Sequence, residues 1–333
     1  ELMHKKVGDD VTLSPQSLQP RVVKIEAVLS KYVYRYQQVL QNFQVNFPHA
    51  NTIQMLKVMD GDELDISLFK KSLEERRKHI DTVLDLFKQN PLPISAFATW
   101  IGIEYREAFE FLTTRPDIGI RCLLRDANEP GGAAASGIHL KNKSFVLDQS
   151  AVLTIENLEL WEQLTGFQLV VMRSVADLFE SHAEKLEDDR SKGTMMLSDS
   201  DQLCLHELSD EERKSRVTRA STLIENIHKY CRIEESLAAA SVDGELRKAF
   251  SDVHAYPSLD SISHAHSDSS FVLWTDEMFM QAVACNDFKI HSVGTQFIIQ
   301  HLRATGKISH EELATFTAKL LGWHYNPIEW NAD

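Results

Sequence analysis

Two apolar runs that each end on an aspartate constrain the fold of this chain most strongly. Residues 145–148 read Phe-Val-Leu-Asp, and residues 271–276 read Phe-Val-Leu-Trp-Thr-Asp. Short continuous apolar runs are typical of strands that are buried on both faces of a parallel sheet. The carboxyl ends of parallel strands lie at one edge of the sheet, where ligands bind. We therefore expect Asp148 and Asp276 to lie together at that edge.

Apolar strands alternate with helical patterns from residue 138 to the end of the chain. A further helix begins at residues 209–212, whose Ser-Asp-Glu-Glu sequence is typical of a capping box. Alternation of this kind predicts an α/β fold with a parallel sheet between layers of helices. We expect a hairpin at residues 192–205 and the helix after it to form an insertion at about 183–255. The predicted strands are residues 145–147, 168–172, 271–275 and 289–293.

The first 127 residues predict an all-helical region. Apolar residues recur at helical spacing over residues 15–47 and 67–88. Two shorter helices are expected within residues 94–112, with Gly102 between them, and they form either a helix-turn-helix or a plain helical hairpin. The segment lacks clustered Lys or Arg to hold phosphates, which favours the hairpin. We interpret this region as a scaffold that contacts other domains or proteins.

A stretch rich in Gly and Ala at residues 128–137 predicts a linker. We therefore expect a helical region at residues 1–127 and an α/β domain at residues 138–333. The chain begins at Glu1 without a secretory pattern, so it can be a piece of a longer protein.

Charge and cysteine content exclude several classes of protein. The 35 Lys and Arg residues against 49 Asp and Glu residues give a formal net charge of -14, which argues against a protein that coats duplex DNA through a basic face. A metal-dependent nuclease remains allowed, because bound cations reverse the local field of an acidic site. No apolar run reaches the ~18 residues of a membrane helix. The four cysteines form no C-x-x-C pair, which argues against zinc and disulfides and favours the reducing cytoplasm.

Three further acids are expected at the same edge as Asp148 and Asp276. Asp177 lies in the first turns of the helix after the second strand, and Glu180 lies one turn further on. Asp260 begins a short helix just before the third strand. Converging carboxylates raise one another's pKa unless a cation lies between them, and their oxygens suit Mg²⁺ or Mn²⁺. We predict Asp148, Asp177, Asp260 and Asp276 as catalytic acids and metal ligands, with Glu180 as a further ligand.

Each of these acids also has a structural interpretation. Asp148 and Asp276 can simply end their strands, since Asp is common in turns. Asp177 follows Ser174 with the spacing of a capping box, and Asp260 lies near a helix start, where a carboxylate stabilises the helix dipole. Glu180 is also expected as a solvated helix residue.

Five short motifs stand out in the second part of the chain: residues 145–153 (FVLDQSAVL), the 192–205 hairpin, residues 273–277 (LWTDE), residues 292–297 (SVGTQF) and residues 306–309 (GKIS). Together they resemble the PIN-domain nucleases, over about residues 138–322. The nearest variant is one found in large bacterial proteins beside tetratricopeptide repeats and a transcript-cleavage-factor-like domain. The family's second acid is usually Glu, whereas here it is Asp177 or Glu180.

The resemblance implies a fold, an activity and partners. The fold would be a PIN-like α/β/α sandwich with a parallel sheet, preceded by the all-helical region. The activity would be metal-dependent cleavage of phosphodiester bonds in RNA, less often in DNA. The helix that holds Asp260 is more polar than is usual in the family. The alternative function is therefore a catalytically degenerate PIN-like module that binds other parts of a larger multidomain protein.

Overall fold

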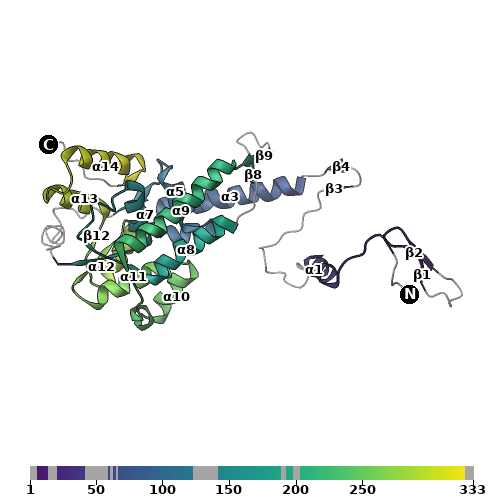
Figure 1. Cartoon of the computed structure of the whole chain (residues 1–333), viewed down its shortest axis with the longest axis horizontal. Helices are drawn as coiled ribbons and strands as arrows, with labels where there is room; N and C mark the ends of the chain where they lie inside the picture. The colour runs from purple at the N-terminus through teal and green to yellow at the C-terminus, as the bar shows by residue number, and fades with distance from the viewer. Residues whose placement is uncertain are drawn as a thin grey trace. The chain divides into compact units, whose positions relative to one another are not determined.

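The computed structural model describes residues 6–13, 21–41, 59–60, 63–64, 67–122, 142–188, 193–197 and 203–326 (Figure 1). The chain forms two compact units, Glu1–Ser72 and Leu73–Asp333. The predicted linker at residues 128–137 and the predicted helical stretch at residues 42–47 lie outside the described residues. No helix among the described residues is both long and apolar enough to cross a bilayer.

The described residues of the first unit form two antiparallel strand pairs, the helix α1 and the beginning of α3. A helix was expected from residue 15, but Arg21–Lys24 instead form a strand whose Val23 pairs with Val11. The prediction was wrong here because Val22 and Val23 are β-branched, which favours a strand, and because they pair with β1. Helical periodicity gives no information about such a pairing. The elements are β1 (Asp10–Leu13), β2 (Arg21–Lys24), α1 (Lys31–Gln41), β3 (Met59–Asp60) and β4 (Glu63–Leu64).

The second unit is built on a five-stranded parallel sheet in the order β10-β7-β6-β11-β12. The predicted mixed α/β fold with a parallel sheet is confirmed. The central strand β6 is buried at every position, so its apolar residues face helices on both sides. The strands are β6 (Ser144–Leu147), β7 (Gln168–Met172), β10 (Cys231–Glu234), β11 (Phe271–Trp274) and β12 (Ser292–Val293).

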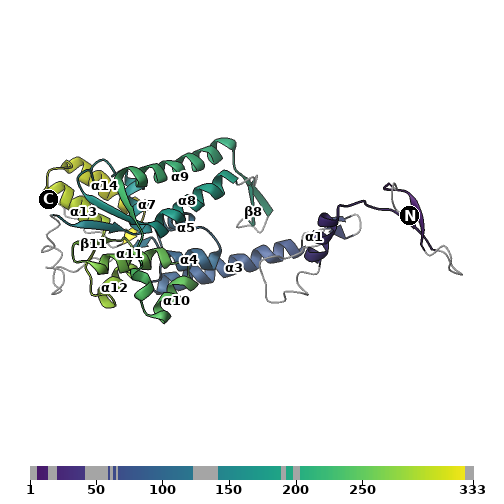
Figure 2. The same cartoon turned by 60° about the horizontal axis from the view of Figure 1, so that its bottom comes forward.

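Helices cover both faces of the sheet (Figure 2). α11 contacts β6, β7 and β11, while α7 and α13 pack against each other on the other face. The predicted hairpin is confirmed as β8 (Gly193–Leu197) paired with β9 (Leu203–Glu207). The helices of this part are α7 (Gln149–Leu158), α8 (Arg173–Asp188), α9 (Asp210–Tyr230), the 3₁₀ turn η1 (Ala238–Ser241), α10 (Gly244–Asp252), α11 (Tyr256–Ser267), α12 (Met278–Asn286), α13 (Thr295–Ala304) and α14 (His310–Gly322).

One strand of the sheet was not predicted. β10 lies within the segment expected as an insertion and pairs in parallel with β7 as the edge strand of the sheet. Its four residues, Cys-Arg-Ile-Glu, follow α9 directly and contain only two apolar side chains. An edge strand with mixed polarity is not distinguished from a helix end by periodicity alone.

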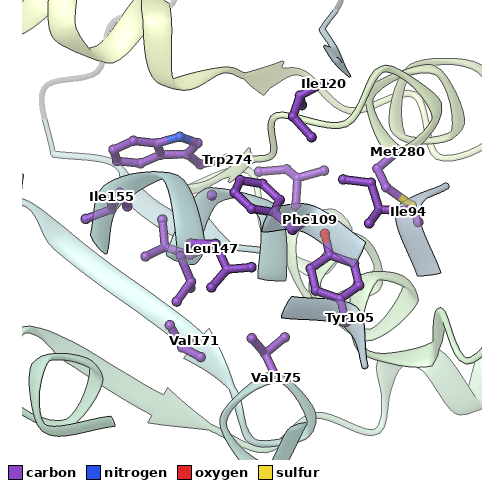
Figure 3. Packing of buried hydrophobic residues seen from close by; sticks show 14 of the residues in the cluster. Ile94, Tyr105, Phe109, Ile120, Leu147, Ile155, Val171, Val175, Trp274 and Met280 are labelled. Carbon is purple, nitrogen blue, oxygen red and sulfur yellow. The ribbon is translucent and has the colours of Figure 1, made fainter. Parts of the chain in front are cut away.

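Helices that precede the sheet in sequence share its core. α3 (Ser67–Gln89) is followed by α4 (Ile94–Ile101) and α5 (Tyr105–Thr113), which form the predicted helical hairpin around Gly102. Phe97 and Phe109 are completely buried in the same apolar cluster as Leu147 and Trp274 of the sheet. Figure 3 shows Phe109 and Tyr105 of this hairpin beside the sheet residues. The compact unit that holds the sheet therefore begins at Leu73, well before the predicted linker.

After α5 the chain forms one strand of a two-stranded parallel sheet that is separate from the main sheet. β5 (Ile120–Arg121) pairs with β13 (Tyr325–Asn326) near the end of the described chain. Gly119 precedes β5 with φ +62°, and a Cβ on it would lie 1.8 Å from the carbonyl oxygen of His324. Only glycine fits both this backbone conformation and this close approach.

The Gly119→Ala variant is expected to be less stable than wild type by about 2–3 kcal/mol, because the clash is with backbone and separates β5 from β13. Gly102→Ala is the matched control, since Gly102 also has positive φ but has nothing within 4 Å of its added Cβ. That variant should lose only about 1 kcal/mol. Urea unfolding of both variants measures the difference, and equal losses would contradict the close approach at Gly119.

Candidate active site

Asp148 lies at the carboxyl end of β6 and begins α7. Its Oδ1 accepts hydrogen bonds from the Ala151 amide at 2.9 Å and from the Ser150 hydroxyl at 2.7 Å. Its Oδ2 accepts a hydrogen bond from the Thr275 hydroxyl. The residue is only 1% exposed. Asp148 is thus the N-cap of α7 and is also held from the neighbouring strand end.

Asp276 lies beside Asp148 at the end of β11, the strand that pairs with β6. Its two carboxylate oxygens accept hydrogen bonds from the amide and the hydroxyl of Thr295, both at 2.6 Å. Ser150 connects the two acids, because its hydroxyl donates to Asp148 and accepts from the Asp276 amide at 2.9 Å. The expectation that the two strand ends bring Asp148 and Asp276 together agrees with this geometry.

Glu277 is a third buried acid at this edge and was not among the predicted site residues. Its Oε2 accepts a hydrogen bond from the Ile94 amide at 2.7 Å, and its Oε1 accepts one from the Tyr105 hydroxyl at 2.7 Å. The side chain is buried, with the residue 3% exposed. The available signal was the pair of consecutive acids at residues 276–277, which places two carboxylates at one strand end.

Each of the three acids receives the amide of a residue in the first turn of a helix. Asp148 accepts from the start of α7, Asp276 from the first residue of α13, and Glu277 from the first residue of α4. The unpaired amides and the dipole make a helix N-terminus favourable for negative charge. The three N-termini therefore offset charge that would otherwise repel within a buried cluster.

Asp260 lies in α11, near the end of β6, because the hydroxyl of its neighbour Ser261 donates to the carbonyl oxygen of Leu147 at 3.4 Å. Its Oδ2 accepts a hydrogen bond from the Ser174 hydroxyl at 2.7 Å. Its Oδ1 is buried without a protein partner among the described residues. Burial raises the pKa of this carboxyl above its ordinary value.

Asp177 and Glu180 have no described contact with the buried acids. The buried face of α8 carries Val175, Ala176 and Phe179, so Asp177 points to solvent with a side chain that is 59% exposed. It pairs with Arg173 at 3.8 Å, and Glu180 pairs with His228 at 3.2 Å. In this arrangement their described ionic contacts are with bases and not with the acids at the strand ends.

Burial dominates the electrostatics of the cluster. It raises the pKa of Glu277 to about 8, with the nearby charge of Asp148 as the second cause. It raises the pKa of Asp148 to about 6, against hydrogen bonds from Thr275, Ala151 and Ser150 that lower it. The pKa of Asp276 is raised by burial as well. A buried carboxylate is costly in its charged form, so these groups favour a proton or a positive partner.

The cluster does not fit a bound divalent ion in this arrangement. Among the described residues, no group of three or more His, Cys, Asp or Glu side chains is placed to hold a metal. The oxygens of Asp148 and Asp276 are directed at protein donors from Ser150, Thr275 and Thr295. The Oδ1 of Asp260 and both side-chain amide atoms of Gln149, next to Asp148, are nevertheless buried without a partner in the described part of the chain.

The middle of the second unit matches a known family of protein domains. Residues 146–286 match the model of the PIN domain associated with the TPR-GreAB-C-PIN system. The predicted resemblance to PIN domains is confirmed. No curated protein and no solved structure gives a significant match to the chain. The matched PIN segment starts within β6 and includes β7, β10 and β11 with the acids that follow β6 and β11, and it suggests a nuclease-type module.

Among the hydroxyls at this edge of the PIN segment, we expect that of Ser150 to contribute most to the stability of the fold. In Ser150→Ala the Asp276 amide loses its acceptor and Asp148 loses a donor, so we expect a loss of about 1–3 kcal/mol in the free energy of unfolding. Ser258→Ala is the control, because that hydroxyl is equally buried but has no partner among the described residues. Denaturant unfolding of the two variants compares them, and a loss in both alike would contradict the bridging role.

Proposed function

We propose that this protein is a metal-dependent nuclease that hydrolyses phosphodiester bonds in RNA. The observation that carries the proposal is the pair Asp148 and Asp276 at the ends of adjacent parallel strands, within the segment that matches a PIN domain. Asp260 is the third proposed acid, since its buried Oδ1 still needs a polar partner. Mg²⁺ or Mn²⁺ is the proposed cofactor, because hard oxygen ligands suit these ions.

In the proposed reaction, neighbouring residues hold the carboxylates at this edge in fixed orientations. Ser150 and Thr275 fix the orientation of the Asp148 carboxylate, and Thr295 fixes that of Asp276. Fixed carboxylates are favourable for catalysis, because no reorganisation is needed as charge develops in the reaction. Asp177 and Glu180 belong to the site only if α8 moves them toward this edge, and we propose no step for them in the present arrangement.

The direct test is to incubate the full chain with single-stranded RNA or DNA and with Mg²⁺ or Mn²⁺. We expect cleavage of RNA that depends on the ion and stops when a chelator is added. Preference for DNA would correct the substrate, and an absence of cleavage with either ion would overturn the proposal. The four free cysteines are compatible with a reducing cytoplasm, where we place the reaction.

The second candidate function is a catalytically degenerate interaction module. It is favoured by the burial of Asp148 and Asp276 and by the protein donors that already occupy their oxygens. In that case the acids serve to anchor helix N-termini, and other domains or proteins bind through the N-terminal helices. Binding of Mn²⁺ by the wild-type chain distinguishes the two functions, because a purely structural cluster has no use for the ion.

A further inference from the structure

Two large aromatic side chains are exposed on helices that border the edge with the proposed catalytic acids. Trp100 of α4 is 38% exposed and Tyr256 of α11 is 37% exposed, although most residues of both helices are buried. Neither the Trp100 indole nitrogen nor the Tyr256 hydroxyl has a hydrogen-bond partner among the described residues. Exposed Trp and Tyr side chains are typical of surfaces that bind another molecule.

The two rings belong to neighbouring parts of the surface. Thr99, next to Trp100, donates from its hydroxyl to the Val253 carbonyl oxygen at 3.1 Å, and the same hydroxyl lies 3.3 Å from Nδ1 of His254. These contacts hold the end of α4 against the turn between α10 and α11, directly before Tyr256 (Figure 2). Trp100 and Tyr256 therefore come together although they are far apart in the sequence.

His254 adds a third exposed ring at this turn. Its φ of +52° lies in the left-handed region that favours glycine, just after the end of α10. Two backbone hydrogen bonds close the turn, from the His254 amide to the Ser251 carbonyl oxygen at 3.1 Å and from the Ala255 amide to the Phe250 carbonyl oxygen at 2.7 Å. Histidine at a position that favours glycine places a further ring on this surface at a cost in backbone strain.

The exposed rings are continuous with the acid edge through α11. Tyr256 and Asp260 are four positions apart on this helix, so their side chains lie one turn apart on the same face. Asp260 is 6% exposed and accepts a hydrogen bond from Ser174 at the start of α8. A strand of nucleic acid that contacts the Tyr256 ring would therefore lie next to the third proposed acid.

The chemistry of this surface fits unstacked bases better than a phosphate backbone. The two cations of α10 are already engaged, since Arg247 donates to the Ala240 carbonyl oxygen at 3.1 Å and Lys248 pairs with Asp252 at 2.6 Å. The whole chain carries a formal net charge of -14, which weakens its attraction for phosphates. Stacking of bases on aromatic side chains needs no cation and accepts every base. A duplex keeps its bases stacked inside, so only a single strand offers them.

We propose that Trp100, His254 and Tyr256 form a stacking platform for the bases of single-stranded RNA and place the strand beside Asp260. The platform rests on the proposed function, for which it names the surface that binds the substrate. It requires neither a bound cation nor any movement of α4, because the three rings are exposed in the present arrangement.

Fluorescence anisotropy of a labelled RNA in a chelating buffer tests the platform without relying on catalysis. The probe is a single-stranded RNA of about ten nucleotides, within the length that one binding surface of this kind covers. We expect the full chain to bind this strand. A duplex of the same sequence and a strand that lacks its bases should both bind more weakly, since neither presents free bases. Equal affinity for all three probes would overturn the platform.

Substitutions of single rings identify the residues that bind. Tyr256→Leu and Trp100→Leu should each weaken binding of the single strand about tenfold, because each removes one stacking ring. Tyr256→Phe restores a ring and should recover most of the affinity that Tyr256→Leu loses. Tyr34→Leu is the matched control, since it removes a 53% exposed ring from the first unit and should leave the affinity unchanged. Urea unfolding shows that each variant remains folded.

The outcomes separate the platform from the proposed nuclease. If the rings bind RNA as expected but neither ion supports cleavage, the platform stands and the nuclease fails. If RNA is cut while Tyr256→Leu and Trp100→Leu keep the wild-type Kd and KM, the platform is overturned and the nuclease stands. An equal loss of affinity in Tyr34→Leu also overturns the platform, because any exposed ring would then have the same effect.

Discussion

Asp148→Asn is expected to reduce Mn²⁺-dependent RNA cleavage at least about a hundredfold, because it removes a full negative charge from the proposed metal ligands. The substitution keeps the shape of the side chain. An amide oxygen can still accept from Ala151 and Ser150, and the amide nitrogen can donate to the Thr275 hydroxyl. The fold should therefore survive, and a loss of activity would report on chemistry.

Asp268→Asn provides the matched control for this variant. Asp268 precedes β11, at the end of the strand away from Asp276, and its carboxylate accepts a hydrogen bond from the Ser270 amide at 2.7 Å. The control removes an identical charge from the same domain and should leave the cleavage rate unchanged. Initial rates measured on one RNA substrate compare the three proteins. Wild-type activity in Asp148→Asn would remove Asp148 from the reaction.

The positions of Asp148 and Asp276 could be predicted from sequence because they depend only on where a buried parallel strand ends. A buried parallel strand puts its carboxyl end at the ligand edge, so the residue after β6 or β11 has little freedom. Asp177 and Glu180 depend instead on the rotation of α8 about its axis. Each residue turns a helix by about 100°, and Val175, Ala176 and Phe179 take the core face.

The contacts of the α4–α5 hairpin with this edge could not be predicted, because they join distant parts of the chain. Ile94 and Glu277 are separated by 183 positions, and Tyr105 and Glu277 by 172. Helical periodicity predicts that α4 and α5 each have an apolar face, but it does not say which surface that face covers. A glutamate after a strand gives no sign in sequence that its partner is a helix amide from another segment.

The pH dependence of stability is the second large effect expected from this cluster. The pKa of Glu277 is raised by burial to about 8 in the fold, against 4.5 for the free side chain. The fold therefore keeps a proton that the unfolded chain releases, and stability falls as pH rises from about 4.5 to about 8. The loss across this range is on the order of 4 kcal/mol. Asp148, with its pKa raised to about 6, contributes in the same direction.

Glu277→Gln should remove most of this dependence, because its amide stays neutral at every pH. Urea unfolding in a chelating buffer at pH 5 and pH 8 measures the effect, and Glu235→Gln at an exposed position is the control that should keep the wild-type slope. A slope that is equal in Glu277→Gln and wild type would show that the buried carboxyl holds no proton. Loss of the slope in Glu277→Gln would show that Glu277 carries a proton in the fold. The metal-free fold would then tolerate Asp148, Asp276 and Glu277 side by side because this proton and three helix N-termini reduce their mutual repulsion, as a bound cation would.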